Sequence, residues 1–141
     1  MNDLRQRLVE AALAWERTFG IAPSITSALS EYDAAMLIGC SAEEYYASMC
    51  GATAVQKGHD FIFNSSRYQV KANRPSGKAG SFVTLVAKAK NYEWDFLIWL
   101  LYDPQYQLQE AWLWEVDAYK EAFDSIKRLS PSHYRKSKRL V

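Results

Sequence analysis

The apolar positions of the first twenty residues follow a helical period. They recur three and four positions apart over residues 3–18, and Gly20 follows as a stop signal. The apolar members are Leu4, Leu8, Ala11, Ala12 and Trp15. We expect this segment to be a packing helix that carries no chemistry.

Three more helices are predicted further along the chain. Residues 30–33, Ser-Glu-Tyr-Asp, have the Ser-x-x-acid form of a helix N-cap, which predicts a helix from Ser30 to Ile38. Residues 41–44 repeat the signal and predict a short helix that ends near Cys50. Residues 116–126 are predicted to form a closing helix.

The pattern changes to strand-like alternation over residues 58–72. The apolar run 61–63 is followed by the polar residues Asn-Ser-Ser and by a second run, 67–72, in which polar and apolar residues alternate. Aromatic and β-branched residues on both sides of a short polar turn are typical of a β-hairpin. This hairpin is the segment around which we expect the chain to be organised.

The register of the hairpin decides which polar side chains meet. If Asn64 and Ser65 form a two-residue turn, Asp60 lies directly across from Gln69. Residues opposite each other, or two apart in one strand, share a face of the sheet. Asp60, Gln69 and Lys71 would then converge on one spot. A turn of odd length would break this alignment.

The remaining strands are predicted from shorter signals. Residues 52–56 are a candidate first core strand. Residues 95–102 form a continuous apolar run, as expected of a strand buried on both faces, and residues 107–115 return as its neighbour. Residues 82–89 fit either a strand or a helix. A buried central strand predicts helices on both sides of the sheet.

Length and composition indicate one globular domain. The 141 residues are 49% hydrophobic and 14% aromatic, which excludes a disordered chain. We assign residues 1–126 to this domain, with its core at about 27–126, and residues 127–141 to a basic C-terminal tail. No apolar run reaches the roughly 18 residues of a membrane span, and the N-terminus lacks a signal peptide pattern. Two cysteines make neither a disulfide framework nor a zinc site. We therefore expect a cytoplasmic protein.

A net charge of +1 conceals a segregation of charge. Residues 67–90 and 126–141 hold 12 of the 17 basic residues and no acid. These residues are Arg67, Lys71, Arg74, Lys78, Lys88, Lys90, Lys127, Arg128, Arg135, Lys136, Lys138 and Arg139. Residues 91–125 carry eight acids and one lysine. Two basic stretches favour a polyanion ligand, although solvated loops and a tail remain the alternative.

Asp60 and the triplet Gln69-Val70-Lys71 resemble the motif of the PD-(D/E)xK, or restriction-endonuclease-like, nuclease superfamily. Gln69 stands in place of the usual acid, a QxK variant similar to Mrr-type restriction enzymes, and His59 replaces a loosely kept proline. The resemblance implies an α/β fold with an αβββαβ core, a mixed central sheet flanked by helices. Residues 82–93 would supply the crossover between strands.

The resemblance also implies a metal-dependent site. Asp60, Gln69 and Lys71 would be the catalytic residues, with Lys71 orienting the attacking water. Mg²⁺, or Mn²⁺ in its place, would be held by Asp60, Gln69, the main-chain carbonyl of Val70, and an acid from the preceding helix. Glu31 is our candidate for that acid, and Asp33 is the alternative because the sequence leaves open which one faces inward.

A DNA surface is expected beside this site. Residues 73–81 form a loop by composition, in which two glycines let the backbone approach a phosphate. Arg74 and Lys78 in this loop, with Lys88 and Lys90 beyond it, are the candidate nucleic-acid contacts, and a plain mobile loop is the alternative.

The leading hypothesis is a metal-dependent endonuclease that hydrolyses phosphodiester bonds in DNA, with RNA not excluded and no membrane partner. A homodimer is the simple expectation if both strands are cut. The alternatives are a catalytically inactive nucleic-acid-binding or adaptor protein with the same fold, and a structural module without a nucleic-acid role.

Overall fold

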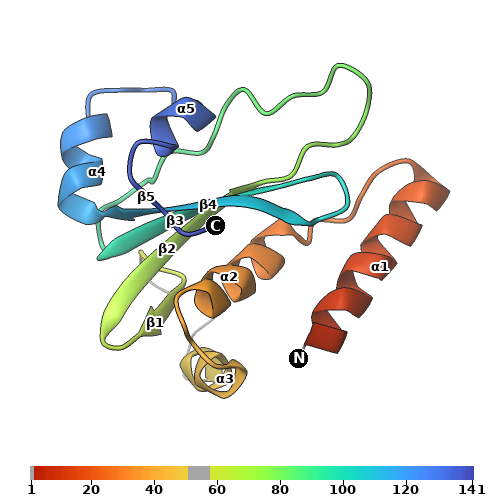
Figure 1. Ribbon diagram of the computed structural model, residues 1–141, viewed down its shortest axis with the longest axis horizontal. Helices are drawn as coiled ribbons and strands as arrows, with labels where there is room; N and C mark the ends of the chain where they lie inside the picture. Colours follow the sequence, from red (N-terminus) through yellow and green to blue (C-terminus); the bar gives the residue numbers. More distant parts are fainter. Residues whose placement is uncertain (1, 51–57) are drawn as a thin grey trace.

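The computed structural model, which describes residues 2–50 and 58–141, has a five-stranded mixed sheet at its centre (Figure 1). The strands are β1 (Phe61–Phe63), β2 (Ser66–Asn73), β3 (Phe96–Tyr102), β4 (Leu108–Glu115) and β5 (Lys138–Arg139), and their order in the sheet follows their order in the chain. β2 and β3 are parallel, whereas the other neighbours are antiparallel. The predicted strand at residues 52–56 lies outside the described residues.

Helices cover both faces of the sheet, as the buried central strand predicted. The helices are α1 (Asn2–Phe19), α2 (Thr26–Leu37), α3 (Ala42–Cys50), α4 (Val116–Phe123) and α5 (Pro131–Tyr134). α1, α2 and α3 lie on one side of the sheet, and α4 and α5 lie on the other (Figure 1). No helix in the described part of the chain has both the length and the apolar character needed to cross a membrane.

β3 divides the hydrophobic core into two parts. Its residues Ile98 and Leu100 pack with the α1–α3 layer, and Leu97 and Trp99 pack with α4 and α5. All four are 0% exposed. Successive side chains of a strand point to opposite faces, so a strand that is apolar throughout stays in place only when both faces are covered.

The predicted hairpin register is confirmed. Phe63 pairs with Ser66 and Phe61 with Tyr68, across a two-residue turn. Asn64 and Ser65 have φ angles of 49° and 66°, the left-handed values that a tight hairpin turn of this length requires. Phe61 and Tyr68 stack with ring centroids 5.0 Å apart, which holds the apolar face of the hairpin together.

The helix predictions were right for α1 and α3 and wrong for the start of α2. Ser41 and Glu44 exchange the two hydrogen bonds of a capping box, each 3.0 Å long, at the start of α3. Ser30, in contrast, is not a cap: α2 begins at Thr26, and the buried Ser30 hydroxyl donates to the Ser27 carbonyl inside the helix. The residue before the helix, Ile25, makes no side-chain cap, so the sequence carries no capping signal there.

The connection between β2 and β3 departs from the expected core. Residues 74–95 contain no helix and no strand, and an isolated β-bridge joins Val86 to Leu129. Val86 and Ala89 are buried against the α4 and α5 layer, so packing rather than regular hydrogen bonding holds this crossover. The α/β class and the flanked mixed sheet are therefore shown, without the helix that an αβββαβ core places between its last two strands.

The C-terminal segment is part of the fold. The closing helix α4 ends at Phe123, three residues before the predicted end at Ile126. Within residues 127–141, α5 buries Tyr134 completely, and β5 pairs with β4. Basic residues of this segment are accordingly tied to the domain: Arg135 binds Glu110 at 2.7 Å.

Candidate metal and nucleic-acid site

A pocket of about 340 Å³ opens at the edge of the sheet, next to the residue that precedes β1. Residues from four separate parts of the chain line it, and most of them are polar. These are Thr26, Ser27, Ser30 and Glu31 of α2, Asp60, the β2 residues Gln69, Val70, Lys71 and Ala72, and Ala87 of the crossover. The structure thus brings Glu31, Asp60, Gln69 and Lys71 to one place.

Asp60 is held by the edge of β2. The regular pairing of β1 and β2 stops at Phe61 and Tyr68, and the Asp60 N–H then donates to the Tyr68 carbonyl at 2.7 Å. The next edge N–H, that of Val70, donates to Asp60 Oδ2 at 2.7 Å. The Asp60 carboxylate therefore accepts the hydrogen bond that a neighbouring strand would otherwise accept from Val70. This bond fixes Oδ2, and Asp60 lines the pocket.

The approach to Asp60 depends on a glycine. Gly58 has a φ of +77°, and a Cβ atom placed there would lie 2.5 Å from Glu93 Cβ. Both the backbone conformation and the close contact exclude a side chain at this position. Gly58 therefore sets the direction in which the chain enters Asp60 and β1.

Glu31 and Asp60 form a carboxyl pair. Burial raises the pKa of Glu31 to about 7, and the negative charge of Asp60 and a hydrogen bond between the two side chains act in the same direction. Two carboxyls that share a pocket cannot both ionise without cost. Glu31 is therefore partly protonated near neutral pH.

Lys71 is half-buried beside this pair. Burial lowers the pKa of Lys71, the Asp60 carboxylate opposes this shift, and the neighbouring Lys90 adds to it. Lys90 lies on the exposed part of the crossover, so the two ammonium groups come together from different segments. They give the pocket a positive rim next to its two acids.

Gln69 and Val70 complete the set of oxygen atoms. Gln69 pairs with Leu97 and Lys71 with Trp99, so both project from the face covered by α4 and α5, whereas Glu31 approaches from the opposite face. The pocket therefore wraps around the edge of β2. The N–H and C=O of one strand residue point the same way, so the Val70 carbonyl opens toward this edge together with the N–H that binds Asp60.

This donor set suits a hard divalent cation. Two carboxylates, one amide oxygen and one main-chain carbonyl are the oxygen ligands that Mg²⁺ accepts, and Mg²⁺ is commonly held by one or two carboxylates. Within residues 2–50 and 58–141, no three His, Cys, Asp or Glu side chains cluster as metal ligands. The fit therefore rests on Glu31 and Asp60, and burial together with the negative charge of Asp60 raises the pKa of Glu31 to about 7.

Asp33 is excluded from the pocket by its own partners. Arg5 donates to both of its carboxylate oxygens at 2.7 Å, and the Tyr102 hydroxyl donates to Oδ2 at 2.6 Å. Asp33 is 9% exposed and faces the core between α1 and the sheet. Of the two acids of α2 that the sequence left open, Glu31 is the one at the pocket.

Sequence reasoning missed the hydroxyl residues of α2. Thr26, Ser27, Ser30 and Glu31 share one face of the helix and line the pocket together. The signal was present as polar residues at helical spacing, but treating Ser30 as a cap placed the first two outside the helix. Tyr45 of α3 packs against the core, and burial, with the charges of Glu31 and Asp60, raises its pKa to about 12.

Two of the four predicted nucleic-acid contacts are already engaged. Arg74 binds Glu16 at 2.8 Å and lies over the Tyr106 ring at 4.4 Å, and its side chain is 7% exposed. Lys88 donates to the main-chain carbonyls of Asp124 and Ile126 just after α4. Arg74 and Lys88 therefore have structural roles: Arg74 ties the loop after β2 to α1, and Lys88 binds carbonyl groups that follow the end of α4. Lys78 and Lys90 remain exposed.

Neither the models of protein families nor the curated proteins give a match to this sequence. The geometry of the pocket is therefore the basis for a functional conclusion.

Proposed function

We propose that this protein is a metal-dependent endonuclease that hydrolyses phosphodiester bonds in DNA, with a site of the restriction-endonuclease-like kind. One observation carries the proposal. Glu31, Asp60, Gln69 and Lys71 come from a helix, a strand entry and a strand, and they line one pocket at the open edge of the sheet. Burial and a second carboxylate raise the pKa of the helix acid Glu31 to about 7. Such a perturbed acid is typical of a functional site and is not expected on a sheet face that is simply exposed to solvent.

The residues divide the work of hydrolysis between them. Asp60 and Glu31 would hold Mg²⁺, together with the oxygens of Gln69 and Val70. The bound cation supplies positive charge to the phosphoryl group. Lys71 orients the attacking water, and its lowered pKa makes a neutral amine more available to take the water's proton at Nζ. Lys90, beside it, offsets the charge of the DNA backbone.

Cleavage of supercoiled plasmid and of single-stranded DNA tests this function. The purified chain is assayed with Mg²⁺, with Mn²⁺ and with EDTA, beside the variants Asp60→Asn and Lys71→Met. Matched controls are Glu121→Gln and Lys138→Met, which change an exposed acid and an exposed lysine away from the pocket. Metal-dependent nicking that both pocket variants lose and both controls keep supports the proposal. Nicking that survives Asp60→Asn rejects it.

A second function is favoured by Gln69. A carboxamide in place of an acid leaves the site with one negative charge fewer, which weakens its attraction for a divalent cation. A protein that binds DNA through this fold without cutting it would show salt-sensitive DNA retardation with and without EDTA, and no nicking under any metal. Absence of both cleavage and retardation excludes both functions.

A further inference from the structure

The crossover between β2 and β3, residues 74–95, presents apolar side chains both to the core and to solvent. Val86 and Ala89 are buried against the α4 and α5 layer. Phe82 is 80% exposed and Leu85 is 56% exposed. Figure 1 shows this segment passing α5 on its way from β2 to β3. The crossover thus carries an apolar surface on the α4 and α5 side of the sheet that the core does not use.

Hydrogen bonds to the C-terminal part of the chain hold the crossover in place. The Val86 N–H donates to the Leu129 carbonyl at 3.0 Å, and the Tyr134 hydroxyl donates to the Ala87 carbonyl at 2.7 Å. A segment that is fixed in this way loses little conformational entropy when a ligand binds to it. Phe82 is therefore presented to solvent by a backbone that other elements already position.

Phe82 forms one wall of a pocket of about 250 Å³. Pro75, Leu101 and Pro131 supply further apolar walls, and Arg135 lines the pocket as well. Since a cavity of about 150 Å³ holds a benzene ring, this pocket has room for one nucleobase. Aromatic rings and guanidinium planes are the surfaces on which unpaired bases stack. The lining of the pocket therefore suits a flat ring system.

This pocket lies beside the proposed nuclease site. Lys71 of that site pairs with Trp99, and Leu101 lies two residues further along β3. Side chains two apart in a strand share a face and are about 7 Å apart, so Leu101 and Lys71 lie on the same face of the sheet. The crossover contributes to both pockets, with Phe82 in one and Ala87 in the other. One strand of nucleic acid can therefore contact both.

Positive charge flanks this surface. Residues 67–90 carry six basic residues and no acid. Lys78 is exposed in the loop that leads to Phe82, and Lys90 is exposed where the crossover leaves the nuclease site. Arg135 binds Glu110 at 2.7 Å, so it offers the pocket a flat face rather than a net charge. Cations on both sides of an apolar ring match the phosphates on both sides of a base.

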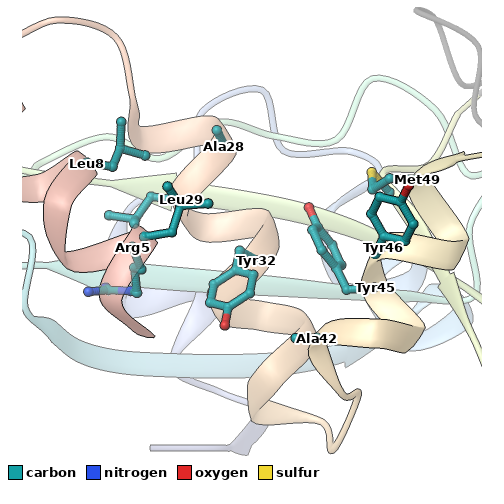
Figure 2. A pocket seen from close by; sticks show the side chains of 10 residues that line it. Arg5, Leu8, Ala28, Leu29, Tyr32, Ala42, Tyr45, Tyr46 and Met49 are labelled. Atoms are coloured by element: carbon teal, nitrogen blue, oxygen red, sulfur yellow. The ribbon is translucent and has the colours of Figure 1, made fainter. Parts of the chain in front are cut away.

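Another apolar pocket lacks this charge. It has a volume of about 270 Å³ and lies between α1, α2 and α3, with Tyr45 and Met49 in its wall (Figure 2). Among the described residues that line it, Arg5 is the one cation, and Arg5 donates to both carboxylate oxygens of Asp33. Charge complementarity to a polyanion therefore favours the pocket beside Phe82.

We propose that the crossover binds a single strand of DNA and leads it to the nuclease site, with one unpaired base stacked on Phe82 in the adjoining pocket. The inference rests on the proposed function and names its substrate class, which is DNA with unpaired bases. Both faces of a base in an intact duplex are already stacked on its neighbours. Only an unpaired base can therefore enter the pocket.

Fluorescence anisotropy in EDTA tests the base contact without cleavage. The probes are labelled oligonucleotides of equal length: a strand of thymidylates, the same backbone with abasic sites, and a duplex. The wild type should bind the thymidylate strand about tenfold more tightly than the other two. Phe82→Ala should lose this preference and keep its affinity for the abasic strand, and Phe82→Trp should retain the preference. Phe19→Ala, at an exposed aromatic residue of α1, is the matched control and should behave as the wild type.

Equal binding of the thymidylate and abasic strands by the wild type overturns the proposal, and so does a preference for the duplex. Tighter binding of a uridylate strand would assign the surface to RNA, and a dimer that Phe82→Ala abolishes in sedimentation would assign it to a second copy of the chain. The plasmid assay keeps the two proposals apart. Base-dependent binding without metal-dependent nicking rejects the nuclease alone, whereas nicking without base-dependent binding rejects the single-strand surface alone.

Discussion

Glu31 of α2 and Asp60 at the entry to β1 meet in the pocket at the sheet edge, and burial together with the negative charge of Asp60 raises the pKa of Glu31 to about 7. The pair is costly for folding when both carboxyls are ionised, since each repels the other in a partly buried place. Asp33, two residues from Glu31, is instead satisfied by Arg5 and Tyr102. α2 thus carries one acid, Asp33, that stabilises the fold and another, Glu31, that destabilises it when ionised. We take this contrast to separate a structural carboxylate from a functional one.

Glu31→Gln should raise the stability of the metal-free protein at pH 8 and leave it almost unchanged at pH 4.5. The folded-state pKa of Glu31, about 7, lies above its ordinary value of 4.5. The wild type therefore loses stability as the pH rises through this window, by about 1–2 kcal/mol after allowance for partial exposure. Urea unfolding at the two pH values measures the difference. Glu43→Gln on the exposed start of α3 is the control, and an equal gain there would remove the argument for a strained pair.

Asp33→Asn should have the opposite effect. It removes the charge partner of the half-buried Arg5, for which a loss of about 2–4 kcal/mol is expected. Urea unfolding at pH 7 measures this loss. Plasmid nicking by the folded fraction should persist, because Asp33 does not reach the pocket. A folded Asp33→Asn protein that no longer cuts would mean that Asp33, rather than Glu31, serves the site.

Divalent metal should bind with release of a proton. Below pH 7, Glu31 must lose its proton before it can act as a ligand, so the affinity for Mn²⁺ should rise by up to about tenfold per pH unit and level off above pH 7. Titration calorimetry in two buffers that differ in ionisation enthalpy measures the number of protons released. Glu31→Gln should release fewer protons than the wild type, and identical values for the two proteins would place the titrating group elsewhere.

Gln69→Glu should strengthen metal binding. The substitution restores the missing negative charge at a position that already lines the pocket, and roughly a tenfold gain in Mn²⁺ affinity is expected. The metal-free variant should also be less stable than the wild type at pH 8, since three acids would then share the pocket. Gln107→Glu, an exposed change in the turn before β4, is the control. A gain in affinity from both variants would indicate a general charge effect.

The salt dependence of DNA binding should separate the basic residues that face solvent from those that hold the fold. Lys78→Ala and Lys90→Ala should each reduce the slope of log affinity against log salt by about one. Arg74→Ala should leave that slope unchanged. It should lower the free energy of unfolding by about 2–4 kcal/mol, because it removes the charge partner of Glu16 from a largely buried ion pair. A reduced slope in the Arg74 variant alone would reverse these assignments.

Local chemistry made the hairpin and the central strand predictable. Asn64-Ser65 tolerates the left-handed backbone of a two-residue turn, and this turn sets the pairing of Phe61 with Tyr68. The period of two then places Gln69 and Lys71 on one face of β2, and Asp60 reaches the same pocket. An apolar run of strand length, Phe96–Tyr102, can remain in water only when both faces are covered, so helices on both sides followed directly. Ser41 and Glu44 carried their capping signal within four residues.

Tertiary packing decided what local sequence leaves open. Whether Glu31 or Asp33 faces the pocket depends on how α2 is rotated against the sheet, and Arg5 and Tyr102, distant in the chain, determine that rotation by binding Asp33. The same holds for Arg74, which looks like a free phosphate contact until Glu16 of α1 is placed beside it. The sequence by itself therefore determined the strand, its turn and the motif on it. Only the folded chain selected the partners of each charge, because a charge takes whichever opposite charge the packing of distant elements brings within reach.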